Sequence, residues 1–414
     1  MQEILEICCG LDVHKESVVA CLLKRKNTES EEKEIRTFKT FLNDLEELKK
    51  WLESENCRHV AMESTGVYWF PVYDVLETAF DGNIELLVTN ARHMKNVPGK
   101  KTDVKDAEWI ATLLRAGLLR GSFIPPSDIR ELRQLTRYRK NIVGDMNTQK
   151  NRIEKFLQQS GFKLSTFLSD VFGVSGRNLM RVLVSKGKLT PLDVENEVRN
   201  ISKGKKDEIK LSINGVLNSH QKDFLKMQLT FLDELLKHLQ TIEDTIAVKS
   251  KPFEKQIENL DTIPGVAVTA ATAIIAEIGI DMSKFPTAEH FCSWAGVVPG
   301  NNESAGKKKT SRITLGNNYI KGLICECAWS VVRSRNTFLS NFYWKLKQKR
   351  GTKKAIIALS RKILVIIYNL LKNDTVFSEQ HFETAKIRQE AFRVKKLNAD
   401  AKKLGFELVP LTTA

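Results

Sequence analysis

The chain has 414 residues, of which 42% are hydrophobic, with 65 Lys and Arg against 50 Asp and Glu and a formal net charge of +15. This composition excludes a disordered chain, the length predicts two or three domains, and no apolar run approaches the ~20 residues of a membrane span. The seven cysteines include no C-x-x-C pair, which predicts reduced, buried thiols rather than disulfides or a zinc site. The basic surplus predicts a polyanionic partner, most commonly nucleic acid.

Two antiparallel strands are predicted from the apolar runs of residues 4–24, which a polar turn separates. An amphipathic helix follows over residues 41–55, with Asn43 as a candidate N-cap. The later elements alternate between strand and helix, over residues 59–65, 70–80, 84–90 and 100–114. This order predicts a mixed α/β sheet, in which ligands gather at the carboxyl ends of the strands.

The Pro-Pro pair within residues 124–128 marks a domain boundary. Helices are predicted over residues 129–159 and roughly 205–250, and their apolar stripes allow either an antiparallel coiled coil or an ordinary helical bundle. Two further helices flank a tight turn at Pro264-Gly265, similar to a helix-hairpin-helix, whose turn amides contact phosphate. The charged tail is expected to be partly extended. We expect a catalytic domain, a helical connector, a C-terminal domain and a basic tail, over residues 1–124, 125–254, 255–373 and 374–414.

Four carboxylates are the candidate catalytic residues. Asp12 lies in the apolar first strand and Glu63 in a buried strand, where an acid is disfavoured unless it is paired or bound to a metal. Asp103 and Asp106 share one face of their helix, and two like charges side by side require neutralisation. If these elements pack together, the acids converge on Mg²⁺, and two ions ~3.5–4 Å apart could act on a phosphodiester. Taken singly, each acid could instead be a cap, a turn former or solvated surface.

Basic residues concentrate between Lys307 and Lys362, where fifteen Lys and Arg accompany a single acid, Glu326. We predict that this region and the basic helix over residues 130–155 contact the backbones of RNA and DNA. The Gly-rich segment 300–310 does not fit a nucleotide-binding P-loop, because five residues separate its glycines. The residues assigned to nucleic-acid binding are Lys100, Lys101, Lys105, Arg133, Arg137, Arg139, Lys150, Arg152, Lys307, Lys308, Lys309, Arg312 and Lys321.

Five stretches stand out in order along the chain: "GLDVHK", "AMESTGVYW", "VTNARHMKNVPGKKTDVKDAEWIATLLRAGLL", "IPGVAVTAATAIIAEIG" and "FCSWAGVVPGNNESAGKK". In this combination they resemble the DEDD transposases of bacterial insertion sequences, family 110. The resemblance implies a RuvC-like, RNase H-type mixed-sheet domain, a coiled-coil connector and a mainly helical C-terminal transposase domain. It also implies that Asp12, Glu63, Asp103 and Asp106 are the family's catalytic, metal-binding tetrad.

The resemblance further implies a serine nucleophile that forms a covalent phosphoserine link to DNA. The matching residue is Ser304, with Ser293 and Ser311 as alternatives, and the lysines Lys307–Lys309 would help to hold the phosphate. Dimers and a tetramer are implied, in which Ser304 of one protomer completes the RuvC-like site of another. A structured guide RNA is implied to pair with donor and target DNA. The expected location is the bacterial cytoplasm, at the nucleoid and not at a membrane.

We therefore predict an enzyme, a DNA transposase or recombinase that moves an insertion sequence by phosphodiester transesterification. One alternative is a RuvC-like junction resolvase or nuclease that uses water, in which Ser304→Ala would cut normally and Asp12→Ala would not. A second alternative is a non-catalytic nucleic-acid-binding scaffold, which would tolerate the loss of all four carboxylates. His14, two residues after Asp12, is expected to be structural rather than catalytic.

Overall fold

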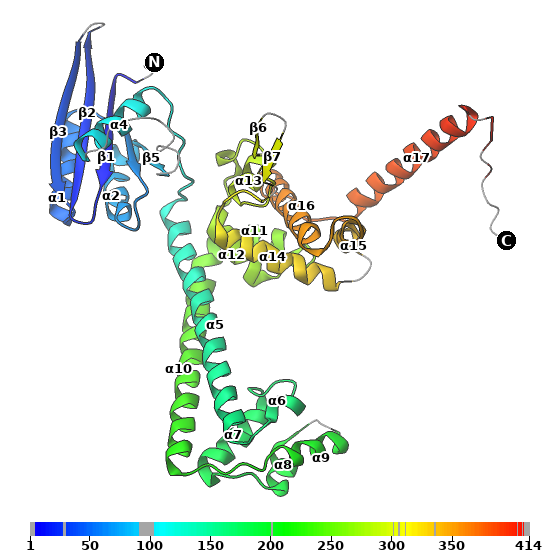
Figure 1. Ribbon diagram of the computed structural model, residues 1–414. Helices are drawn as coiled ribbons and strands as arrows, with labels where there is room; N and C mark the ends of the chain where they lie inside the picture. Colours follow the sequence, from blue (N-terminus) through cyan, green and yellow to red (C-terminus); the bar gives the residue numbers. More distant parts are fainter. Residues whose placement is uncertain are drawn as a thin grey trace. The chain divides into compact units, whose positions relative to one another are not determined.

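The computed structural model of the chain (Figure 1) divides into two compact units, Met1–Ile124 and Pro125–Ala414. Among the described residues, none of the helices has the length and apolar character to cross a membrane. The residues that the structure describes are 5–27, 30–90, 103–199, 202–300, 302–304, 307–310, 312–334, 337–403, 405–407 and 409.

The first unit is built on a five-stranded mixed sheet with the strand order β3-β2-β1-β4-β5. Strands β1, β2 and β3 are antiparallel neighbours, whereas β4 and β5 run parallel to β1. The strands are β1 Ile7–Val13, β2 Ser17–Asn27, β3 Ser30–Lys39, β4 His59–Glu63 and β5 Glu85–Thr89. The predicted mixed α/β sheet is therefore confirmed.

Strand β3 was not predicted, because its sequence is dominated by charged residues. It is an edge strand, and Glu32 lies opposite the oppositely charged Lys24 of β2, while most of its other charged residues lie opposite uncharged residues. Only a few of its side chains, such as Ile35 and Phe38, pack against the buried clusters of the sheet. Charged residues are tolerated at a sheet edge, where they also discourage pairing with another chain, so the apolar alternation that normally indicates a strand is weak here.

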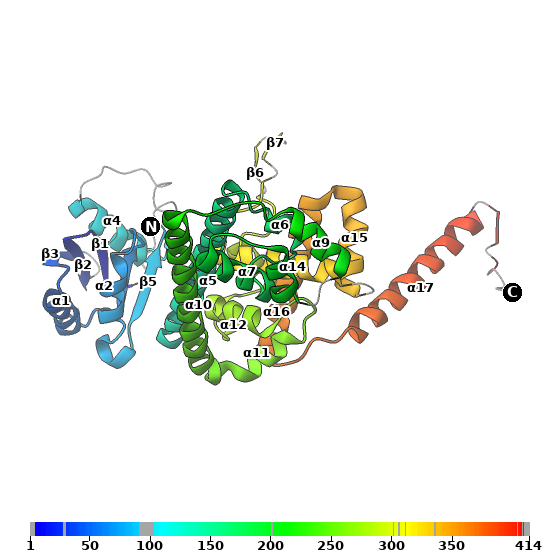
Figure 2. The ribbon, with the colours of Figure 1, turned by 90° about the horizontal axis from the view of Figure 1, so that it is seen from below.

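Helices cover both faces of this sheet. In Figure 2, α4 lies on one side of the strands and α1 and α2 lie on the other, in agreement with two separate buried clusters. The prediction of Asn43 as an N-cap is wrong, because Phe41 holds the extended cap position and Asn43 lies inside the helix. The helical elements are α1 Leu42–Ser54, α2 Trp69–Leu76, η1 Ala79–Gly82 and α4 Asp103–Arg115.

Two long antiparallel helices, α5 Ser127–Gln159 and α10 Ser219–Ser250, begin the second unit. At one end of the pair Lys249 Nζ lies 2.7 Å from Glu131 Oε2, and at the other end the rings of Phe156 and Phe224 lie 5.3 Å apart. The residue numbers of the contacting partners thus increase along α5 as they decrease along α10, which confirms the antiparallel pairing.

Among the described residues, four short helices connect α5 to α10, and the helical stretch predicted over roughly 205–250 is present but is interrupted between α9 and α10. The chain leaves the helical conformation after Leu211, and α10 begins anew where Asn218 and Gln221 form a reciprocal capping box. Such a cap satisfies the free amides of a first turn, so it marks a true helix start. The connecting helices are α6 Leu164–Phe167, α7 Val174–Lys186, α8 Pro191–Glu197 and α9 Lys203–Leu211.

The buried carboxylate of Asp193 closes the first turn of α8. It accepts hydrogen bonds from the amide and hydroxyl of Thr190 and from Lys186 Nζ at 2.7–2.8 Å. The hydrogen bond from Lys186, followed by those from Thr190, lowers the pKa of Asp193 from 3.8 to about 2.

We expect Asp193→Asn to lower the free energy of unfolding at pH 7 by about 1 kcal/mol, because the charged partner of Lys186 is lost. The folded pKa lies below the ordinary one, so the stabilisation is complete above about pH 4 and is lost as the pH falls towards 2. Thermal unfolding at both pH values measures this. The difference between wild type and variant should disappear at pH 2, whereas Glu197→Gln on the same helix should show no such convergence.

The remainder of the second unit is mainly helical, with one two-stranded hairpin. The expectation of a partly extended tail is wrong for residues 380–403, which form a helix rich in good helix formers such as Ala, Glu, Gln and Lys. The elements are η2 Lys251–Phe253, α11 Glu254–Asp261, α12 Val268–Ile278, η3 Met282–Lys284, α13 Ala288–Trp294, β6 Asn302–Ser304, β7 Lys307–Thr310, α14 Asn318–Arg333, α15 Phe338–Arg350, α16 Thr352–Asn373 and α17 Gln380–Lys403.

The predicted turn at Pro264-Gly265 joins α11 to α12, and Gly265 has a φ of +83°. A Cβ at this position would lie 2.8 Å from the carbonyl oxygen of Cys327 and 2.9 Å from the amide nitrogen of Val331. The turn therefore packs directly on α14, and glycine is required both for its backbone conformation and for this close approach.

Candidate catalytic site

Helix α4 packs unusually close to the central strand β1. A Cβ added to Gly10 would fall less than 3.0 Å from the carbonyl oxygen of Ala107 and the amide nitrogen of Ala111, a separation that real Cβ atoms do not show. One step earlier on the strand, the thiol of Cys8 donates to the carbonyl oxygen of Ala111 at 3.5 Å. Strand β1 and helix α4 therefore run in opposite directions, so that residue numbers increase along the strand as they decrease along the helix.

This register brings the start of α4 towards Asp12. Two residues advance a strand by ~6.6 Å and four residues advance a helix by ~6 Å, so the two elements stay in step. Cys8 lies beside Ala111 and Gly10 beside Ala107, and the next step pairs Asp12 with the helix position of Asp103. Asp106 follows within the same first turn.

Glu63 reaches the same edge from the neighbouring strand. Gly10 and Ala61 are partners in the parallel pairing of β1 with β4, and both Asp12 and Glu63 lie two residues further on. Side chains two apart share a face of a strand, and Ala61 packs with Ile110 of α4. Asp12 and Glu63 therefore extend from the sheet face that α4 covers.

Asp12 is buried, with 6% of its surface exposed. The Nε2 of His14 lies 3.0 Å from its Oδ2 and is placed to donate to it, and the expected structural role of His14 stays a prediction. Glu63 and Asp106 are half-buried. Among the side chains that the structure describes, no three from His, Cys, Asp and Glu lie close enough to hold one metal ion, and the side chain of Asp103 is outside that set. The donors are all carboxylates, the type that suits Mg²⁺.

A hollow opens at the carboxyl ends of β1 and β4. Its volume is about 470 Å³. Its lining includes His14, which contacts Asp12, and Thr65, which lies two residues beyond Glu63. Ligands of open α/β sheets bind outside the carboxyl ends of strands. The complete lining is His14, Lys15, Glu16, Ser17, Thr65 and Tyr68.

Ser304 lies on β6, where its Cα partner in β7 is Lys307. The base of this hairpin is fixed by backbone hydrogen bonds from Gly300 to the carbonyl oxygen of Arg312 and from Thr314 to that of Val298, at 2.8 and 2.9 Å. The structure describes β6 and β7 by their backbone alone, so the orientation of the serine hydroxyl is not specified. Of the alternative serines, Ser293 is exposed on α13, and Ser311 lies outside the described residues.

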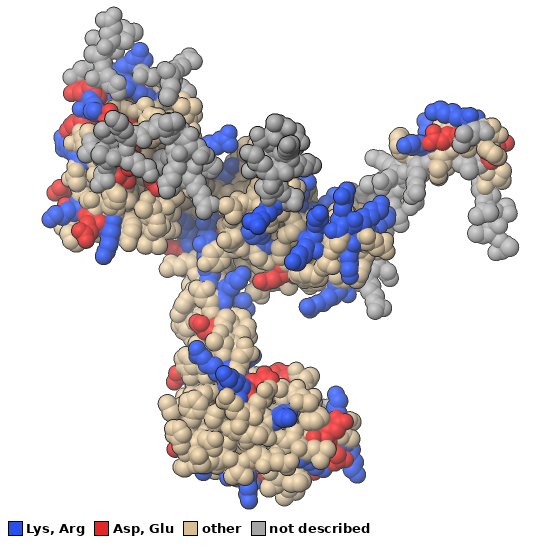
Figure 3. Space-filling model, viewed as in Figure 1, with Lys and Arg blue, Asp and Glu red and all other residues tan. Residues whose placement is uncertain are grey.

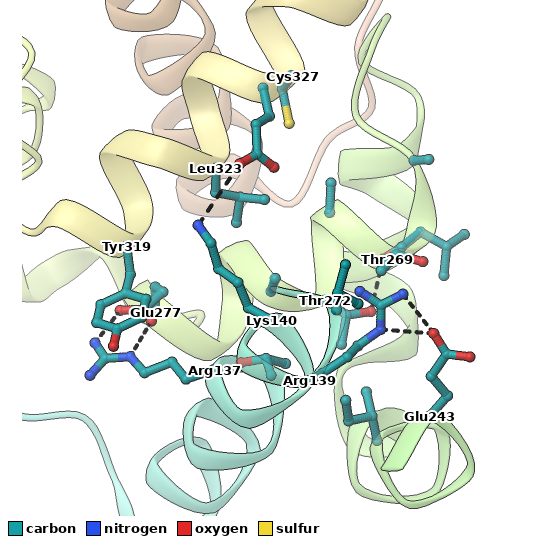
Figure 4. Close-up of a pocket in the computed structure, with 18 of the residues that line it drawn as sticks. Arg137, Arg139, Lys140, Glu243, Thr269, Thr272, Glu277, Tyr319, Leu323 and Cys327 are labelled. Atoms are coloured by element: carbon teal, nitrogen blue, oxygen red, sulfur yellow. Dashed lines mark hydrogen bonds and ion pairs between the residues drawn. The ribbon is translucent and has the colours of Figure 1, made fainter. Parts of the chain in front are cut away.

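Three arginines among the predicted nucleic-acid contacts bind groups of α10 and α12. Arg137 donates through Nε and Nη2 to both carboxylate oxygens of Glu277, at 2.7 and 2.8 Å (Figure 4). Arg133 donates to the carbonyl oxygens of Ala276 and Glu277, and Arg139 donates to Glu243 of α10. Their placement gives these arginines a role in fixing α5 to α12 and α10, and their predicted role at a phosphate stays a prediction.

Glu277 is the centre of this network, with 4% of its side chain exposed. Asn317, the N-cap of α14, donates to it at 3.0 Å, and the guanidinium of Arg137 lies 3.9 Å above the ring of Tyr319. Glu277, Arg137 and Tyr319 also line a cavity of about 910 Å³ between α5, α10, α12 and α14. Sequence reasoning missed Glu277, although an acid inside the apolar run "AIIAEIG" is the same signal that marks Asp12.

We expect Glu277→Ala to lower the free energy of unfolding by about 3–5 kcal/mol, because Arg137 and Arg133 lose the anion that compensates their burial. Denaturant unfolding of the full chain measures this value. The matched control is Glu243→Ala, which removes the half-exposed partner of Arg139 and should cost about 1 kcal/mol or less. Equal losses for the two variants would contradict the role given to Glu277.

The other predicted nucleic-acid contacts are distributed along the chain. Lys100 and Lys101 lie outside the described residues, and Lys105, like Lys307–Lys309, is described by its backbone alone. In the second unit, Lys150 lies 5.6 Å from the ring of Phe172, and Arg152 donates to Gln149 at 3.5 Å. Arg312 is exposed and Lys321 is half-buried on α14.

The strongest visible concentration of positive charge lies elsewhere in the basic segment. Figure 3 shows Lys and Arg gathered over α15 and the adjoining start of α16. This surface falls within the segment Lys307–Lys362 that the sequence marks as basic. Its residues are Lys345, Lys347, Lys349, Arg350, Lys353 and Lys354.

Comparison with known proteins gives relatives among bacterial mobile elements. The pilin gene-inverting protein of Moraxella bovis is 31% identical over 127 residues, which cover 30% of this chain and 39% of that protein. An uncharacterized 42 kDa protein of insertion element IS900 from Mycobacterium paratuberculosis is 24% identical over 330 residues, 71% of this chain and 80% of its own length. The chain spans less than half the length of the first curated relatives that it matches.

Two solved structures of RuvC from Thermus thermophilus, one in complex with a Holliday junction substrate, match 28% of this chain and at least 99% of their own. Their sequence identities are 10% and 12%, and the TM-score of 0.23 is too low to argue from, so the fold rests on the strand order itself.

Two family profiles match the chain directly. The DEDD profile of IS110, described as "Transposase", matches residues 9–162, and the profile described as "Transposase IS116/IS110/IS902 family" matches residues 257–343. Together these matches span more than half of the chain and include all five residues of the predicted catalytic set. The chain belongs to the IS116/IS110/IS902 family of transposases.

Proposed function

We propose that the protein cuts and rejoins DNA strands of an insertion sequence, with Ser304 as nucleophile and with Asp12, Glu63, Asp103 and Asp106 as ligands of Mg²⁺. The observation that carries this proposal is the shared register of β1, β4 and α4, which directs the backbone positions of all four acids to one edge of the sheet. Residues from separate segments of the chain have no packing reason to gather four negative charges there, because like charges at short range destabilise a fold.

The chemistry is a transesterification. The Ser304 hydroxyl attacks the phosphorus, a new Oγ–P bond forms, the bond to the leaving sugar oxygen breaks, and the serine proton passes to that oxygen. Rejoining reverses the exchange, with the hydroxyl of another strand displacing the serine, so the number of ester bonds is conserved. Bound Mg²⁺ would supply positive charge for the phosphate oxygens and the leaving oxygen. The lysines of β7, whose backbone is paired with that of β6, are candidates to hold the phosphate.

The partners in this proposal are donor and target DNA, a structured guide RNA, and further copies of the chain that bring Ser304 to the tetrad of another protomer. The formal charge of +15 and the basic surface on α15 and α16 support polyanionic partners. Base pairing by the RNA would then select the sequence, while the protein holds backbones. The bacterial nucleoid is the proposed site of action.

The decisive experiment is recombination between two plasmids that carry donor and target sites, with the RNA flanking the element supplied or omitted. Wild type should recombine only with the RNA, and Ser304→Ala and Asp103→Ala should not recombine. A denaturing gel should show a protein–DNA adduct that Ser304→Ala lacks and that Ser293→Ala, the exposed serine of α13, retains. Normal cutting by Ser304→Ala but not by Asp103→Ala would favour a nuclease that uses water. Full function in both variants would favour a scaffold.

A further inference from the structure

The hollow at the carboxyl ends of β1 and β4 contains side chains that the proposed chemistry does not use. Tyr68 is its aromatic member and has 38% of its surface exposed, beside Val67 with 67% exposed. Lys15 supplies an exposed ammonium group, and Ser17 and Thr65 supply hydroxyls. An exposed aromatic residue at this edge is not needed for the core, because the buried cluster beneath is completed by Trp69.

Backbone and side-chain hydrogen bonds hold both rims of the hollow in place. On the β1 side, the amide of His14 donates to the carbonyl oxygen of Ser17 at 2.9 Å, and the hydroxyl of Thr40 donates to that of Lys15 at 2.8 Å. On the β4 side, the amide of Thr65 donates to the carbonyl oxygen of Glu63 at 2.9 Å, and the backbone amide of Tyr68 donates to the carbonyl oxygen of Thr65 at 3.3 Å. The hollow is therefore formed before any ligand binds, which reduces the entropy that binding must overcome.

The hollow adjoins two of the carboxylate residues through its lining. One of its residues, His14, contacts Asp12 directly, and another, Thr65, is hydrogen-bonded to the backbone of Glu63. A nucleic acid strand with one phosphate at the carboxylates therefore presents its next nucleotide within reach of the hollow, because successive nucleotides are only ~3.4 Å apart along one strand of a duplex. An aromatic ring stacks on any base, and an ammonium group pairs with a phosphate.

We propose that this hollow holds the nucleotide next to the scissile phosphate, with its base stacked on Tyr68 and its outer phosphate near Lys15. The proposal rests on the proposed function, since it needs a DNA strand at the tetrad, and it adds a site that selects an unstacked base at the point of cutting. Enzymes that act within a duplex commonly take a base out of the stack and place it on an aromatic residue. The volume of about 470 Å³ accommodates a single nucleotide rather than a peptide helix.

The test is a two-by-two comparison of cleavage by the full chain with its guide RNA. DNA substrates carry either a normal or an abasic nucleotide at each position flanking the cut, and the protein is wild type or Tyr68→Ala. We expect Tyr68→Ala to slow cleavage about tenfold and Tyr68→Phe to retain the wild-type rate. At one flanking position, the abasic nucleotide should slow wild type about tenfold and should slow Tyr68→Ala no further.

The matched control is Phe70→Ala, because Phe70 is an equally exposed aromatic residue of α2 that stacks on Trp69 and does not line the hollow. The abasic nucleotide should slow cleavage by Phe70→Ala about tenfold, as it slows wild type. Thermal unfolding of all variants separates loss of folding from loss of the site. Independent, multiplying penalties for Tyr68→Ala and the abasic nucleotide, or a normal rate for Tyr68→Ala, would overturn the inference while leaving the proposed function intact. Absence of cleavage by wild type would instead remove the proposed function itself.

Discussion

Asp12→Asn should abolish strand cleavage while the chain stays folded and still binds DNA. The substitution keeps the size of the side chain and its contact with His14 but removes one negative charge from a buried acid of the tetrad. Loss of a single group that stabilises charge in a transition state costs roughly 10²–10³-fold in rate. Stability should not fall, because the variant relieves repulsion among neighbouring carboxylates when Mg²⁺ is removed. Cleavage rates and thermal unfolding, each with Mg²⁺ and with a chelator, measure both expectations.

Glu108→Gln is the matched control for this prediction. Glu108 is also an acid of α4, but it lies outside the tetrad, is 38% exposed and pairs with Lys33 of β3 at 3.0 Å. Its loss should leave cleavage near the wild-type rate. Cleavage by Asp12→Asn at a similar rate would mean that the acids of this edge do not take part in the reaction, and the proposed function would then fail.

Gly10→Ala should destabilise the first unit and stop cleavage, although it adds only one methyl group to a residue outside the tetrad. The new Cβ would collide with the carbonyl oxygen of Ala107 and the amide nitrogen of Ala111, which are backbone atoms and cannot rotate away. Helix α4 must therefore move, at a cost of roughly 3 kcal/mol. Because Asp103 and Asp106 begin that helix, they move with it, and a displacement of ~1 Å in a catalytic group can cost 10²-fold in rate.

Gly144→Ala tests whether this effect comes from the contact and not from losing a glycine. Gly144 lies within α5, and a Cβ added there would meet nothing within 4 Å. The variant should be as active as wild type and more stable by about 0.5–1 kcal/mol, because alanine is the better helix former. Chemical denaturation and cleavage assays on both variants decide the matter. A Gly10→Ala protein with wild-type stability would show that α4 does not pack on β1 as described.

The acids of the first unit could be predicted because their signal is local. Asp12 and Glu63 each interrupt or close an apolar strand, and apolar strands are identified from a short window of sequence. The sequence does not show that these two strands are neighbours. Their parallel pairing in the structure does. The metal ions and the chemistry of Ser304 stay predictions, since neither the acid side chain of Asp103 nor the serine side chain is described.

The arginines of α5 show why charge alone is a poor guide to function. A basic helix predicts phosphate contacts only if its cations face solvent, and sequence gives no information on a partner more than a hundred residues away. Arg137 meets Glu277 across such a distance, and strand β3 was missed for a related reason, since it is a strand through its pairing with β2 and not through an apolar pattern of its own. In both cases the pairing is decided by tertiary packing, which local patterns do not record.

The antiparallel helices α5 and α10 have a consequence for how chains of this kind can vary. Gly161 and Gly215 approach each other where the chain leaves and re-enters the pair, so the stretch between them starts and finishes at one place. Residues 161–215 can therefore be lengthened, shortened or replaced without disturbing the opposite end of the helix pair, where Glu131 pairs with Lys249. We therefore expect natural size differences among related chains to accumulate at residues 161–215, and this segment to be a favourable place to graft a label or a foreign module.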